Sequence, residues 1–168
     1  MQIKDKFLKD ALLKCGWQEN RSINVKNYQA WYHQFGILPS DIIYDFLKNF
    51  GGLTLKIPCC RYQNRVISNQ DSDFTTSFVI DPTFYVTDDF TQEDRMESYE
   101  YLKDIASFLN IKELFPIGYS DKSEELLMST IGEVVLAYEG DCICLGRNFE
   151  EAFIRIITDE NTEMQSIW

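Results

Sequence analysis

Apolar residues recur at helical spacing in the first third of the chain. They predict helices over residues 3–12, from about Asn27 to Phe35, and from Pro39-Ser40-Asp41 to Phe50. The first third is therefore expected to be helical. A glycine follows each predicted helix and ends it, because glycine adopts a left-handed backbone at low cost: Gly16, Gly36 and the pair Gly51-Gly52.

After the third helix the pattern changes to one that is typical of strands. Apolar and polar residues alternate over 53–57, which predicts a half-buried strand. Residues 74–80 are rich in strand-forming side chains and are closed by the turn Asp81-Pro82. The polar segment 61–73 between them is expected to be a loop or a strand edge. A long helix is then predicted over about 92–109, with its apolar residues on one face.

The last third of the chain predicts an antiparallel meander. Four short apolar segments are separated by turn-forming residues, as in consecutive hairpins: residues 114–117, 126–128, 134–138 and 143–145. Asn148 is a suitable N-cap for a final helix over 149–157, and the tail after Thr158 is expected to fray. Helices at both ends with strands between them indicate an α+β fold. Residues 1–168 are expected to form a single domain whose core spans about 7–157.

The composition indicates where such a chain would reside. Hydrophobic residues make up 45% of it and aromatic residues 14%, which is ample material for a core. There is no window of about 18 uncharged apolar residues, so no membrane span is predicted. The N-terminus lacks the apolar segment of a secretion signal, so we expect a cytoplasmic protein. The five cysteines, an odd number, fit free thiols in a reducing compartment.

The negative charge of the chain is concentrated in its later part. The formal net charge is −11; residues 1–65 hold 10 Lys/Arg and 5 Asp/Glu, whereas residues 66–168 hold 6 Lys/Arg and 22 Asp/Glu. A nucleic-acid partner is not expected, because a phosphate backbone requires clustered Lys and Arg. The imbalance favours either a basic partner or simple solubility.

Few residues suggest chemistry, and the sequence predicts no catalytic, cofactor-binding or metal-binding residue. The single histidine, His33, lies near no Ser or Cys nucleophile motif. Cys59-Cys60 and Cys142-x-Cys144 lack zinc-ligand spacing, and Asp71-Ser72-Asp73 is not followed by the glycine and glutamate of a calcium loop. Adjacent carboxylates such as Glu150-Glu151 leave a small carboxylate-dependent hydrolase as a less favoured alternative.

The order of these motifs resembles the SUKH superfamily, and within it the third family of bacterial immunity proteins. The resemblance extends over about residues 7–157, and each motif has its counterpart in order along the chain. The matching elements are Leu13-Lys14-Cys15-Gly16-Trp17, Arg21, Tyr28, Gly36, the segment 46–53, Asp81-Pro82, the segment 114–118, the segment 126–135 and the closing helix over 149–157.

This resemblance implies an α+β protein that protects a bacterium by binding a cognate toxin, often a nuclease. Several residues that carry it are expected to set packing and turns rather than contact a partner: Trp17, Gly51, Gly52, Pro116 and Gly118. The same fold also serves as a regulatory or scaffold module that binds cellular proteins, which is the main alternative.

The acidic segment 71–100 is the predicted partner-binding surface, since it holds nine acids against one arginine, Arg95. An acidic inhibitor would cover the basic surface that a nuclease uses for phosphates, and opposite charges would speed the encounter. Acids at the start of a helix also stabilise its dipole, which is the competing explanation. The candidate partner-binding residues are Asp71, Asp73, Asp88, Asp89, Glu93, Asp94 and Glu97.

Overall fold

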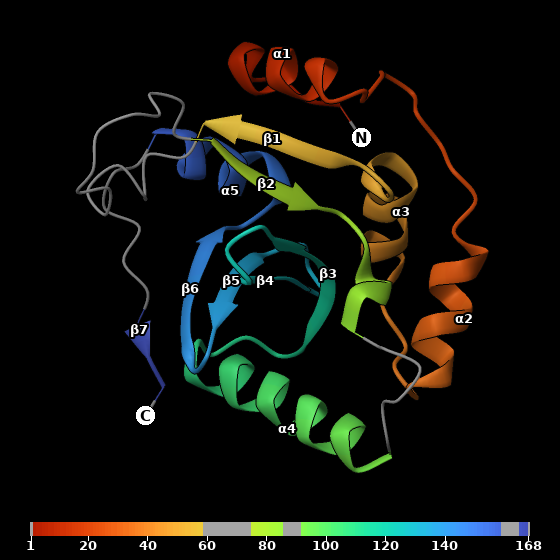
Figure 1. The fold of residues 1–168 in the computed structure, drawn as a ribbon, viewed down its shortest axis with the longest axis vertical. Coiled ribbons are helices and arrows are strands. Elements are labelled where there is room, and N and C mark those ends of the chain that lie inside the picture. The colour runs from red at the N-terminus through yellow and green to blue at the C-terminus, as the bar shows by residue number, and fades with distance from the viewer. Residues whose placement is uncertain (1, 59–74, 86–91, 159–164, 168) are drawn as a thin grey trace.

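A computed structural model describes residues 2–58, 75–85, 92–158 and 165–167 (Figure 1). Apart from the 3-10 helix η2 and the short strand β7, helices and strands follow in the order that the apolar pattern predicts. Their bounds are α1 (Lys6–Lys14), α2 (Lys26–Gln34), α3 (Asp41–Phe50), β1 (Thr54–Pro58), β2 (Thr75–Val79), the 3-10 helix η2 (Pro82–Tyr85), α4 (Gln92–Phe108), β3 (Leu114–Ser120), β4 (Glu125–Ser129), β5 (Val134–Tyr138), β6 (Asp141–Gly146), α5 (Phe149–Thr158) and β7 (Gln165–Ser166).

The strands form one antiparallel sheet in the order β1-β2-β3-β4-β5-β6-β7, so every strand pairs with its neighbours in sequence. This arrangement confirms the α+β class and extends the predicted meander to the whole sheet. Although α4 separates β2 from β3, Phe78 pairs with Ser120 and Val79 with Tyr119. Asp141 and Cys142 of β6 also pair with β7, a short strand in the tail that the apolar pattern did not indicate.

Local sequence signals set the helix ends. The Asp5 carboxylate accepts a hydrogen bond from the Leu8 amide at 2.8 Å and caps α1, and Asn148 caps α5 through the Glu151 amide at 2.9 Å. Gly16 and Gly36 have φ angles of 87° and 68°, the left-handed conformation expected just after a helix. Gly16, Gly36 and Asn148 therefore confirm the predicted helix ends at these positions, whereas α1 begins at Lys6 rather than at Ile3.

One face of the sheet carries the main core, which is built from α1, α2, α3, α5 and the inward side chains of the strands. An aromatic stack lies at its centre: the ring centroids of Phe50 and Phe149 are 4.3 Å apart, as are those of Phe149 and Phe153. Trp17 stacks on Phe50 and is fully buried, which confirms its predicted packing role.

Helix α4 covers the opposite face and forms a second, smaller core (Figure 1). Its Leu102 and Ile105 pack in the cluster that includes Leu127 of β4 and Val135 of β5. Because successive strand residues point to opposite faces, Leu126 joins the main core while Leu127 joins the second one. The central strands are thus buried on both sides, and the outer face of α4 is left for solvent or a partner.

Candidate functional site

The predicted partner-binding acids fall into two groups in the structure. Asp71, Asp73, Asp88 and Asp89 lie outside the described residues, as do Cys59 and Cys60. Glu93 and Asp94 lie in the first turn of α4, and Glu97 lies exposed one turn later. The described part of the predicted surface is therefore the outer side of α4.

Glu97 belongs to a row of acids along α4. Glu100 and Asp104 follow it at intervals of three and four residues, which places all three on one side of the helix, and all are exposed. We call Glu97, Glu100 and Asp104 the α4 acidic face. Lys103 pairs with Glu100 at 2.7 Å, so the face keeps a net negative charge. An exposed pair of this kind is weakly coupled and available to exchange partners.

The flank of α4 is anchored by Tyr101, whose ring packs against the second core. Burial, together with the nearby carboxylate of Glu125, raises the pKa of Tyr101 to about 12. Its phenol is therefore neutral at physiological pH. The charge of this region comes from the carboxylates of the α4 acidic face.

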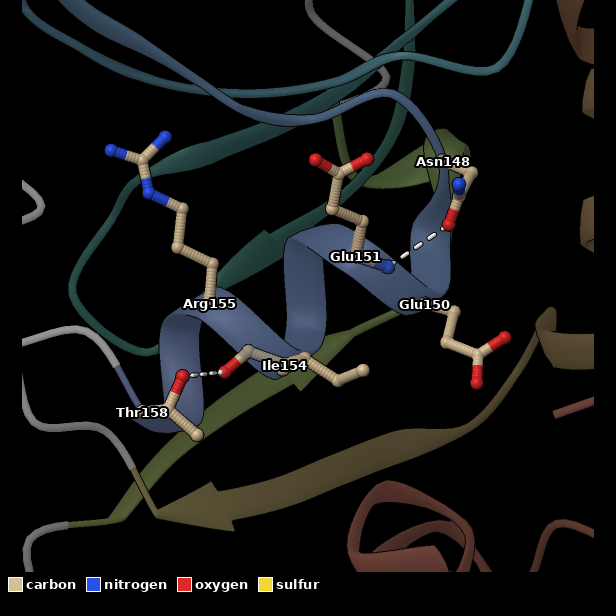
Figure 2. Close-up of a pocket in the computed structure, with 6 residues that line it drawn as sticks. All are labelled: Asn148, Glu150, Glu151, Ile154, Arg155 and Thr158. Atoms are coloured by element: carbon tan, nitrogen blue, oxygen red, sulfur yellow. Dashed lines mark hydrogen bonds between the residues drawn. The ribbon is translucent and has the colours of Figure 1, made fainter. Parts of the chain in front are cut away.

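A surface depression of about 670 Å³ lies along α5 (Figure 2). It is lined by Asn148, Glu150, Glu151, Ile154, Arg155 and Thr158. All six residues come from one helix and its cap, and Figure 2 shows Glu150 and Glu151 pointing to different sides of it. Adjacent positions on a helix diverge in this way, so these two carboxylates do not face each other as a hydrolytic pair would.

The polar groups of the α5 depression are engaged within the protein. Glu150 Oε1 accepts hydrogen bonds from the backbone amides of Lys4 and Asp5, at 2.8 and 2.6 Å. Glu151 Oε2 accepts one from the Arg147 amide at 3.0 Å, and Arg155 donates to the Cys144 carbonyl at 3.0 Å. These contacts tie the chain start and β6 to α5, so we interpret the depression as a structural feature rather than a binding site.

A different surface lies at one end of the sheet, where three exposed aliphatic side chains come from two regions far apart in sequence: the α2–α3 loop with the start of α3, and the β4–β5 turn. Leu38 is 78% exposed, Ile131 70% and Ile42 44%. The Ser40 hydroxyl donates a hydrogen bond of 3.1 Å to the Thr130 carbonyl, which joins the α2–α3 loop to the β4–β5 turn. We call Leu38, Ile42 and Ile131 the apolar end patch.

Sequence reasoning did not select the apolar end patch as a candidate site. Ile131 was visible only as part of the predicted turn at Thr130-Ile131-Gly132, and Leu38 as part of the link between two helices. The available signal was a large aliphatic residue in a segment expected to be exposed. Their proximity depends on the packing of α3 beside the β4–β5 turn, which no local pattern reports.

Two hollows adjoin the apolar end patch. One of about 170 Å³ is lined by the α2–α3 loop, Leu102 of α4 and the start of β3: Gly36, Ile37, Leu38, Leu102, Glu113, Leu114 and Phe115. A second of about 250 Å³ shares Leu102, Glu113 and Leu114 with it and extends along α4. The surface therefore runs from the patch to the side of α4.

Within the described ranges, no group of three or more His, Cys, Asp or Glu side chains is placed to hold a metal ion. His33 is exposed near the end of α2, and the described cysteines, Cys15, Cys142 and Cys144, are free thiols. Among the helices of this part of the chain, none has the length and apolar character needed to cross a bilayer.

The described part of the chain is an α+β protein built on a seven-stranded antiparallel meander with helices on both faces. The profile of the SUKH-3 immunity protein family matches residues 4–159. The chain belongs to this family, whose membership implies a toxin-neutralising immunity function. Neither the curated proteins nor the solved structures give a significant match.

Proposed function

We propose that this protein neutralises a cognate bacterial toxin by stoichiometric binding, and that the toxin is a basic protein, most simply a nuclease, met by an acidic surface. The observation that carries the proposal is the α4 acidic face, which projects from the helix that covers the second core. Catalysis by the immunity protein is not required, because occupying the toxin's basic surface is sufficient.

Charge supports this interaction in two ways. A nuclease presents Lys and Arg to phosphate groups, so a protein with acids in a row competes for the same surface. Long-range attraction between opposite charges also raises the association rate, and salt weakens that attraction. An antidote gains from fast encounter, since damage accumulates until the toxin is bound.

The test is co-expression with the toxin domain encoded beside this chain's gene. We expect rescue of growth, a purified one-to-one complex, and weaker binding as the salt concentration rises. A toxin that still kills and forms no complex with the protein would contradict the proposal.

The surface is tested separately by single charge reversals. Glu97→Lys and Asp104→Lys should slow association several-fold, whereas Asp10→Lys, an exposed acid on α1, should not. Glu100 is left unchanged because it pairs with Lys103. Equal association rates for all three variants would show that the toxin binds elsewhere.

A further inference from the structure

The apolar end patch has the features of a preorganised anchor. The Ser129 hydroxyl accepts hydrogen bonds from the amides of Ile131 and Glu133, at 3.3 and 3.0 Å, and so fixes the turn that carries Ile131. A Cβ placed on Gly132 would lie 3.6 Å from Ile42 Cγ2, so the turn rests against α3. A rigid surface loses little conformational entropy on binding.

Exposed aliphatic side chains gathered at one place differ from exposed residues scattered singly, which are normal on any protein. Leu38 projects beside the 170 Å³ hollow that it lines with Leu102 and Leu114. A partner side chain entering this hollow would contact aliphatic groups from the α2–α3 loop, from α4 and from β3. This is the arrangement of a central binding anchor surrounded by a rim.

Two exposed acids border the patch. Asp41 precedes Ile42, and Glu113 lines the hollow with Leu38. The nearest lysines on the α4 side, Lys103 and Lys112, line the neighbouring hollow, and Lys103 is paired with Glu100. A partner that covers Leu38 and Ile131 therefore meets carboxylates and should carry cations around its apolar group.

We propose that the apolar end patch is the anchor for the cognate toxin, and that it receives an aliphatic or aromatic side chain carried on a Lys- or Arg-bearing segment of the toxin. This inference rests on the proposed function and names the contact that holds the complex. The α4 acidic face governs the rate of encounter, whereas the patch governs how long the complex lasts. Anchors of this kind act mainly on dissociation.

The experiment measures association and dissociation rates with the purified toxin domain for the full chain and two single variants, Leu38→Ser and Ile131→Ser. Each should bind at least about tenfold more weakly, through faster dissociation. The matched control is Phe7→Ser on α1, another largely exposed apolar residue at 58% exposure, and it should bind like the wild type. All variants should unfold at nearly the wild-type temperature, because the replaced side chains are exposed.

A fourth variant, Glu113→Lys, tests the charge of the rim. We expect weaker binding and a smaller dependence of affinity on salt. Equal affinities for the wild type, Leu38→Ser and Ile131→Ser would overturn the anchor while leaving the proposed function intact. A wild-type protein that does not bind the toxin contradicts the proposed function itself. If the wild type is a dimer and Leu38→Ser is a monomer that binds the toxin unchanged, the patch contacts a second copy of this chain and not the toxin.

Discussion

The hydroxyl of Tyr32 on α2 donates a hydrogen bond to the carbonyl oxygen of Pro116 on β3, inside the main core. Pro116 lies where the β3–β4 register shifts between Pro116 and Gly118. Tyr32 is fully buried, so its phenol supplies a donor at a place that water does not reach. This contact fixes α2, and the loop that carries Leu38 after it, to the sheet.

Replacing Tyr32 by Phe should lower the free energy of unfolding by about 1–3 kcal/mol, since the buried Pro116 carbonyl loses its donor while the ring stays. Urea titration of the wild type and the variant measures the difference. Tyr44→Phe is the matched control, because Tyr44 on α3 is only partly buried, and it should change stability little. Equal losses for both variants would show that the hydrogen bond to Pro116 is not the cause.

The stability of the protein should fall at alkaline pH. Burial, followed by the neighbouring Tyr44 and Tyr28, raises the pKa of Tyr32 well above its ordinary value, and burial with Glu125 raises that of Tyr101 to about 12. In the unfolded chain these tyrosine phenols ionise near pH 10, which is a lower pH than in the folded protein. The unfolded state therefore loses its protons first as the pH rises. The stabilisation is complete below that pH and is lost as pH rises through the folded-state pKa values.

Denaturation at pH values from 8 to about 11 measures this loss, and Tyr32→Phe should show a shallower decline than the wild type. A free energy of unfolding that stays constant from pH 8 to about 11 would contradict the predicted loss of stability. The absorbance of ionised tyrosine provides an independent reading, since the most buried phenols should ionise only together with unfolding.

Gly118→Ala should be severely destabilising. A Cβ on Gly118 would lie 2.1 Å from the Val79 carbonyl oxygen, and backbone atoms on a paired strand have little freedom to move. We expect the free energy of unfolding to fall by at least about 3 kcal/mol, or the variant not to fold. Gly36→Ala is the control: nothing lies within 4 Å of its Cβ position, so only its positive φ of 68° resists the change, at about 1–2 kcal/mol. Thermal melts should rank the two variants in this order.

Arg21 should contribute to stability through the end of α3. Its guanidinium donates to the carbonyl oxygens of Asn49 and Gly51, at 2.9 and 2.8 Å, which are groups that a helix leaves without internal partners. Arg21→Ala should lower the free energy of unfolding by about 1–2 kcal/mol. Arg21→Lys should recover only part of this loss, because an ammonium group lacks the planar, two-pronged donor arrangement of a guanidinium. Arg147→Ala, an exposed arginine, is the control in the same urea titration, and an equal effect there would contradict this role.

Much of the backbone could be predicted from the sequence, because helix ends and hairpin turns depend on residues only a few positions apart. Gly16, Gly36 and Asn148 stop or start helices through their own conformational and hydrogen-bonding properties, wherever the helix later packs. The candidate acids could be named from the density of acidic residues over 71–100, and the helical spacing of Glu97, Glu100 and Asp104 then places these three on one side of α4. The apolar end patch could not be predicted in this way, because its side chains come together only through contacts between residues that are distant in sequence.

The sequence by itself determined the α+β class, the element order, the acidic later part and the turns that terminate each element, all through local conformational preference and periodicity. Only the tertiary structure decided that α4 closes the second face of the sheet, that the α5 carboxylates hold backbone amides, and that Leu38 and Ile131 share one surface. The reason is physical: such contacts come from packing complete elements against one another, and their energy depends on pairs of residues that no local pattern brings together.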